Sequence, residues 1–158
     1  VAHPISRRFS TDDLGPLVTS AASVAPHATV LLDGELEATG LDVVLTGTLQ
    51  VPWEGECRRC LTDVAGTVEA DVREVFSPHP VEGETWPIVD DGIDLVSVAR
   101  DIALLVLPLV PLCRADCQGP DPERFPATVE DDGADGGVDA DEGARDPRWA
   151  ALDQLRFD

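Results

Sequence analysis

The chain has 158 residues, enough for one domain of ordinary size and a tail, and 43% of them are hydrophobic. Its formal net charge of −20 disfavours broad contact with nucleic-acid phosphates or with an anionic membrane surface, and it favours a basic partner. No apolar signal-peptide core follows Arg7 and Arg8, and no apolar run is long enough to cross a membrane. We therefore expect a cytoplasmic protein.

The first part of the chain shows little periodicity. Residues 1–27 contain Pro4, Pro16 and Pro26, which interrupt any long regular element. We therefore expect an irregular N-terminal segment that holds at most one short element.

Three segments then alternate between apolar and polar residues, as half-buried strands do. They are residues 28–38, 42–51 and 64–76. Asp33, Glu35 and Glu37 fall on the polar face of the first segment. Such strands in succession predict an antiparallel meander with one buried face.

A helix follows a loop that is rich in Pro, Gly and acidic residues. Trp86 and Ile88 lie in this loop in a pattern that fits a short strand, and Asp94 then has the position of a helix N-cap. Apolar residues recur at helical spacing from Leu95 until Pro108 ends the pattern. We predict an α+β domain over residues 28–118, with a small three- to four-stranded antiparallel sheet and one packed helix.

The remaining residues change character. Residues 119–145 are rich in Gly, Asp, Glu and Pro, which predicts a disordered acidic linker. The part from Asp121 to Glu142 carries −8 of the total charge, which leaves −12 for the rest of the chain. Residues 146–158 open with Asp146 and Pro147 and predict a short helix. Trp149 lies on its apolar stripe and is a candidate contact for a partner.

Two short cysteine pairs contain all four cysteines of the chain, Cys57 with Cys60 and Cys113 with Cys117. A close pair followed by a second close pair is typical of tetrahedral Zn²⁺ sites. The first pair falls in the turn between the second and third predicted strands, as in a zinc knuckle. Because a four-thiolate zinc centre is negatively charged, nearby guanidinium groups would favour the thiolates, and Arg58, Arg59 and Arg114 lie beside the pairs.

Two other interpretations of the cysteines remain open. The thiols can be free and packed as small apolar groups, or they can carry dithiol redox chemistry. With four protein ligands a zinc ion would have no open position, so a catalytic zinc is disfavoured. The sequence shows no nucleophile elbow, no Walker loop and no dinucleotide fingerprint, and we expect a protein that is not an enzyme. Without a basic surround, we expect the tryptophans in the core or at an interface.

The order of these motifs resembles the YceD-like family, known as large-ribosomal-subunit rRNA accumulation proteins. The resemblance rests on Leu45 to Leu61 with the first cysteine pair, on Ile93 to Gly119 with the second, and on Asp146 to Leu152. It implies a cytosolic factor in large-subunit assembly, whose gene often neighbours that of a small basic ribosomal protein. Many members continue after the second pair with two further cysteines. Here Asp121 and Arg124 stand at those positions.

We therefore expect a non-enzymatic factor in large-ribosomal-subunit assembly that holds a structural Zn²⁺ ion. Its expected partner is a basic large-subunit ribosomal protein or the precursor large subunit, attracted by Asp33, Glu35 and Glu37 and by the tail. One alternative is direct contact with rRNA through Arg58, Arg59 and Arg114. Another is a small dithiol redox protein.

Overall fold

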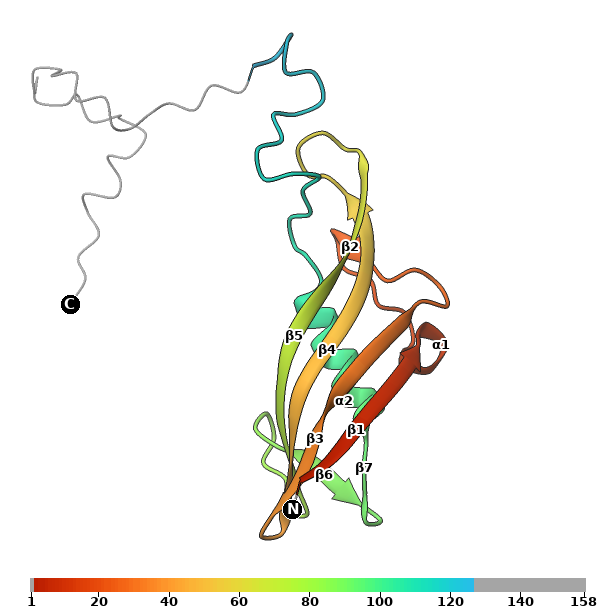
Figure 1. Ribbon diagram of the computed structural model, residues 1–158, viewed down its shortest axis with the longest axis vertical. Coiled ribbons are helices and arrows are strands. Elements are labelled where there is room, and N and C mark those ends of the chain that lie inside the picture. Colours follow the sequence, from red (N-terminus) through yellow and green to blue (C-terminus); the bar gives the residue numbers. More distant parts are fainter. Residues whose placement is uncertain (1, 127–158) are drawn as a thin grey trace, which may run out of the picture. The chain divides into compact units, whose positions relative to one another are not determined.

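The computed structural model describes residues 2–126, and a mixed seven-stranded sheet dominates them (Figure 1). The sheet contains the long strands β1 (Ala2–Ser10), β3 (Thr29–Thr39), β4 (Asp42–Glu56) and β5 (Asp63–Ser77). Short strands are β2 (Ala22–Ser23), β6 (Trp86–Val89) and β7 (Gly92–Ile93). The order is β1-β3-β4-β5-β6-β7, with β2 on β4, and β6 runs parallel to β5 while the other pairs are antiparallel.

The predicted fold class, an α+β domain with a three- to four-stranded meander, is wrong. The three predicted strands are present as β3, β4 and β5, but the sheet has seven strands and includes a parallel pair. β4 and β5 also reach farther than expected, because their pairing continues from Val43 opposite Phe76 to Glu56 opposite Asp63. The described part of the chain is mainly β-structure.

The prediction of an irregular N-terminal segment is also wrong. β1 pairs with β3 along its whole length, from Ala2 opposite Glu37 to Ser10 opposite Thr29. The short helix α1 (Thr11–Leu14) follows directly, and its N-cap Ser10 exchanges hydrogen bonds with Asp13 in a capping box. Most side chains of β1 are exposed, so the strand lacks the apolar alternation by which strands are predicted.

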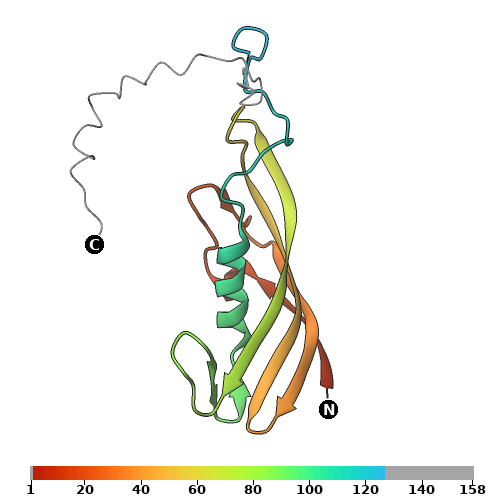
Figure 2. The ribbon, with the colours of Figure 1, turned by 90° about the vertical axis from the view of Figure 1, so that its left-hand side faces the viewer.

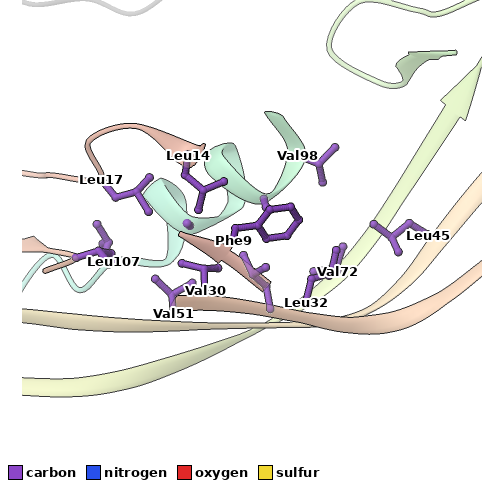
Figure 3. Packing of buried hydrophobic residues seen from close by; sticks show 14 of the residues in the cluster. Phe9, Leu14, Leu17, Val30, Leu32, Leu45, Val51, Val72, Val98 and Leu107 are labelled. Atoms are coloured by element: carbon purple, nitrogen blue, oxygen red, sulfur yellow. The ribbon is translucent and has the colours of Figure 1, made fainter. Parts of the chain in front are cut away.

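The hydrophobic core lies between one face of the sheet and the helix α2 (Leu95–Val106). Figure 2 shows this helix lying along that face. Asp94 caps this helix as predicted, with hydrogen bonds from the backbone N–H groups of Val96 and Ser97. Figure 3 shows how α2 and the segment after β1 meet the sheet through side chains from β1, β3, β4 and β5. The labelled members of the cluster are Phe9, Leu14, Leu17, Val30, Leu32, Leu45, Val51, Val72, Val98 and Leu107.

The opposite face of the four long strands carries no covering layer among residues 2–126 (Figure 2). Val30 and Leu32 are buried on the core side of β3, whereas Asp33, Glu35 and Glu37 are exposed. This uncovered side is called the outer face below. The predicted linker and C-terminal helix fall mostly on residues 127–158, outside the described residues.

Candidate metal centre

The first cysteine pair lies in the turn that joins β4 to β5, as predicted. The N–H of Cys57 donates to the carbonyl of Thr62 over 2.8 Å, and the N–H of Leu61 donates back to the carbonyl of Cys57 over 2.9 Å. Leu61 takes a left-handed conformation with φ 61°, which closes the turn. The turn therefore places Cys57 and Cys60 at the tip of the longest hairpin.

The second pair arrives from the end of α2. The helix ends before Leu107, whose extended backbone and the following Pro108 direct the chain away from the helix axis. Pro111 is buried, and its carbonyl accepts a hydrogen bond from the backbone N–H of Arg58 over 2.9 Å. This bond attaches the second cysteine segment to the hairpin tip.

All four sulfur atoms lie within 4.8 Å of one another. The Sγ atoms of Cys57 and Cys117 are 3.8 Å apart, and those of Cys60 and Cys113 are 3.6 Å apart. Four bonds of about 2.3 Å at tetrahedral angles separate the sulfurs of a zinc site by roughly 3.8 Å. The cluster therefore has the size that a four-thiolate metal centre requires, and the four cysteines can hold a metal ion.

The two pairs are exposed to different degrees. Cys57 and Cys117 are buried, Cys60 is partly buried and Cys113 is exposed. One cysteine from each pair thus faces the interior, and the other faces the solvent side of the cluster. This arrangement encloses the centre on one side and leaves an approach for an ion on the other.

Two of the three nearby arginines donate to backbone carbonyls. Arg59 Nη1 donates to the carbonyls of Cys117 over 2.8 Å and of Ala115 over 3.2 Å, which fixes the second cysteine loop. Arg58 Nη2 donates over 2.8 Å to the carbonyl of Ser20, in the segment before β2. Arg114 instead points to an exposed partner, because its Nε lies 3.4 Å from Asp116.

The thiols differ in acidity. Backbone hydrogen bonds from Cys60 and Cys113 lower the pKa of Cys57 to about 5. Thr62 lowers the pKa of Cys60, and their Sγ and Oγ1 atoms are 3.1 Å apart. The sulfurs of Cys117 and Cys60 raise the pKa of Cys113 to about 12. Because crowded thiolates repel one another, a bound cation would favour ionisation of the whole set.

Asp121 and Arg124, at the positions of further family cysteines, are not members of the cluster. The backbone N–H of Arg124 donates to the carboxylate of Asp121, and its guanidinium lies over the ring of Phe125. The four cysteines can supply all four ligands of a tetrahedral ion without these positions.

Sequence reasoning missed three residues that hydrogen-bond to the first cysteine turn. They are Ser20, which accepts from Arg58, Pro111, which accepts from the same residue's backbone, and Thr62 beside Cys60. The carbonyls of Ser20 and Pro111 belong to the backbone, so no side-chain pattern marks them. Thr62 follows Cys60 by two residues, and its side chain is the one feature of the three that the sequence could have indicated.

The predicted partner-binding acids lie away from the hairpin tip that carries the cysteines. Asp33, Glu35 and Glu37 lie opposite Thr48, Thr46 and Val44, in the half of β4 that is farther from this tip. They share the outer face with Glu69 and Asp71 of β5. Trp149, the remaining predicted contact, lies outside the described residues.

These features define a mainly β-structured protein with a four-cysteine centre that joins a hairpin tip to the end of a helix. Residues 45–156 match the sequence profile of the family described as "Large ribosomal RNA subunit accumulation protein YceD". The chain belongs to this family, as its motifs indicated. The name of the family refers to accumulation of the RNA of the large ribosomal subunit.

Mycobacterial proteins are among the relatives. A protein of Mycobacterium bovis and one of Mycobacterium tuberculosis, both named uncharacterized proteins, are each 35% identical over 132 residues, which cover 78% of this chain and 60% of the relative. A protein of Mycobacterium leprae with the same kind of name is 35% identical over 99 residues, 58% of this chain and 46% of the relative. The chain thus spans 60% of the length of the first relatives. No solved structure matches it significantly.

No helix within residues 2–126 has the length and apolar character needed to cross a membrane.

Proposed function

We propose that this chain promotes accumulation of large-subunit rRNA as a non-enzymatic assembly factor that binds a basic protein of the large subunit. The main support for this proposal is the outer face of the sheet, which is uncovered and strongly acidic within residues 2–126. The family match supports the ribosomal setting, and the net charge of −20 supports a cationic protein as the direct partner.

The charge of the outer face follows from the register of its strands. Exposed acids from β3, β4 and β5 alternate with the core-facing residues, and Gln50 donates to Glu69 across the β4–β5 pair over 3.1 Å. The basic residues that share this face are Arg8 and Arg73. Its acids are Asp33, Glu35, Glu37, Asp42, Glu54, Glu56, Asp63, Glu69 and Asp71.

Such a face suits a basic protein better than RNA. Phosphates would meet a surface of their own charge, whereas the lysines and arginines of a cationic protein would be attracted from a distance and would bind faster. Binding would also screen the partner's charge until it reaches rRNA. In this account the link to rRNA runs through the bound protein.

We further propose that the four-cysteine centre holds a structural Zn²⁺ ion. The sulfur separations support zinc, and four protein ligands leave no open coordination position for catalysis. The ion would fix the end of α2 and the hairpin tip of β4 and β5 relative to each other.

Direct rRNA contact through the arginine cluster receives less support. The guanidinium groups of Arg58 and Arg59 donate to Ser20, Ala115 and Cys117 carbonyls, so binding phosphate would compete with these bonds. Arg114 instead forms an exposed ion pair with Asp116. A single arginine can neutralise few RNA phosphates.

The test measures binding of the purified protein to large-subunit rRNA and, separately, to purified basic large-subunit ribosomal proteins at near-physiological salt. We expect protein binding that weakens when Asp33→Asn, Glu35→Gln and Glu37→Gln are combined. A matched control removes the same charge from the acidic segment through Asp131→Asn, Asp132→Asn and Asp135→Asn, and should weaken binding less. Tight rRNA binding without protein binding, lost on Arg58→Ala and Arg59→Ala, would contradict the proposal.

A further inference from the structure

A second acidic feature is concave and lies on the other side of the sheet, beside α2. The loop after β5, the start of β6 and the exposed side of α2 enclose a groove of about 580 Å³. This volume falls in the range of ligand-binding clefts. Its lining includes Trp86, Pro80, Glu74, Glu82, Glu84 and Asp101. This cavity is called the Trp86 groove.

A hydrogen bond fixes the aromatic wall of the groove. The indole Nε1 of Trp86 donates to Glu74 Oε2 over 2.8 Å, and both side chains are partly buried. Glu74 lies on the core-facing side of β5, between Val72 and Phe76, where an apolar residue continues the pattern of the strand. A carboxylate held at such a position presents a negative charge at the boundary of the core.

The carboxylates of the groove have no cationic partner within residues 2–126. The ion pairs of that part of the chain join His27 to Asp12 and Arg114 to Asp116, and neither pair lies in the groove. Arg100 precedes Asp101 in α2, but its guanidinium donates to the carbonyls of Leu14 and Pro16. A concave site lined by like charges concentrates their field and attracts a cation.

We propose that the Trp86 groove binds an arginine side chain of the basic protein partner, an inference that rests on the proposed function. A planar guanidinium can stack on the indole of Trp86 while it donates hydrogen bonds to the Glu74 carboxylate. Glu82, Glu84 and Asp101 line the same groove and add further negative charge. A lysine ammonium supplies the charge without the planar stacking surface, so the groove prefers arginine.

The groove and the outer face have different roles in this account. The outer face is broad and attracts any cationic surface, whereas the groove accepts one side chain and discriminates between its chemical types. Removal of outer-face charge should therefore slow association with every cationic peptide. Removal of groove groups should abolish the preference for arginine.

The test uses the full chain and a soluble Gly-Ser peptide that contains arginines, with lysine and citrulline versions of the same peptide. NMR follows the indole N–H resonance of Trp86, which is assigned by its loss in Trp86→Phe. The arginine peptide should shift this resonance and bind about tenfold more tightly than the citrulline peptide. The lysine peptide should fall between them.

Glu74→Gln combined with Asp101→Asn should reduce the affinity for the arginine peptide about tenfold. The amide oxygen of Gln can still accept the indole N–H, which preserves the local fold. The matched control combines Glu69→Gln with Asp71→Asn on the outer face; it makes the same change in charge and should keep both the indole shift and the preference for arginine.

Equal binding of the arginine and citrulline peptides, or an unshifted indole resonance, would overturn the inference. So would an equal loss in the groove and control variants, because net charge alone would then explain the binding. These results leave the proposed function standing if the wild-type chain still binds a basic ribosomal protein. Absence of that binding, together with an indole shift by the arginine peptide, would reject the proposed function and leave a cation-binding groove.

Discussion

At the scale of single residues, the cysteine centre depends on arginines that hold backbone carbonyls. Arg59 spans both cysteine segments, because its own backbone belongs to the first turn while its side chain binds the carbonyls of Ala115 and Cys117. The sequence suggested that the guanidinium of Arg59 stabilises thiolates or contacts RNA. In the structure this guanidinium instead joins the two cysteine loops. Arg114 does not connect the two loops, so its substitution can be compared with that of Arg59.

The comparison of Arg59→Ala with Arg114→Ala separates these roles. Arg59→Ala leaves two carbonyls without their donor and should lower metal affinity, by about tenfold if one charged hydrogen bond is lost. Arg114→Ala removes an exposed ion pair and should change metal affinity little. Competition with a colorimetric zinc chelator measures both affinities. Equal affinities in the two variants would show that Arg59 does not position the second loop.

The four-cysteine cluster also leads to a prediction of the metal content of the protein. Protein purified without chelator should contain about one Zn²⁺ per chain, and Cys57→Ser should lose most of it. Because protons compete with zinc for all four thiolates, the ion should leave as the pH falls. Elemental analysis across a pH series checks this. Metal-free protein whose four thiols all react in the native state would reject the zinc centre.

At the scale of elements, the periodic segments and the antiparallel order of β3, β4 and β5 were predictable, whereas the pairing of β1, β2, β6 and β7 was not. β3, the hairpin of β4 and β5, and α2 all show clear apolar periodicity, and their positions agree with the predictions. The placement of Cys57 and Cys60 at the hairpin tip followed from that hairpin. The meeting of the two cysteine pairs was expected from their chemistry alone.

The errors have physical causes. β1 buries only Phe9, because its other core-facing positions include the polar residues His3 and Arg7, and Pro4 resembles a strand breaker. β6 pairs with β5 in parallel through a connection that no local pattern specifies. The Trp86 groove could not be predicted from the sequence either. It depends on the hydrogen bond between Trp86 and Glu74, which forms only because the connection after β5 brings these two residues together.

The N-cap of α2 gives a prediction at this scale. Asp94→Ala removes the acceptor for the N–H groups of Val96 and Ser97 and should lower the free energy of unfolding by about 1 kcal/mol near neutral pH. Hydrogen bonds from Ser97 lower the pKa of Asp94 in the folded protein. Its stabilisation is therefore present above about pH 4, the range of an unfolded Asp, and is lost as the pH falls through the folded pKa.

Urea denaturation at a series of pH values measures the effect, with Asp94→Asn as the control. Asn caps helices about as well as Asp and does not titrate, so this variant should stay close to the wild type at neutral pH. A difference between the wild type and Asp94→Ala that does not shrink in acid would show that the carboxylate charge is irrelevant to the cap.

At the scale of the whole chain, the sheet separates the outer face from the core and α2. The outer face is acidic and uncovered within residues 2–126, whereas the Trp86 groove opens on the side of α2. The four-cysteine cluster lies at the end of the hairpin, apart from the middle of the outer face. This separation predicts that Asp33→Asn, Glu35→Gln and Glu37→Gln should leave zinc content and folding intact.

On the function proposed above, the outer face supports accumulation of large-subunit rRNA in the cell. The most direct measurement is the ratio of large- to small-subunit rRNA in cells that lack the gene and are complemented with wild-type protein or with the Asp33→Asn, Glu35→Gln, Glu37→Gln variant at equal levels. We predict that the ratio falls in the absence of the gene, recovers with the wild type, and recovers only partly with the variant. Full recovery with the variant, or an unchanged ratio in cells that lack the gene, would contradict the account.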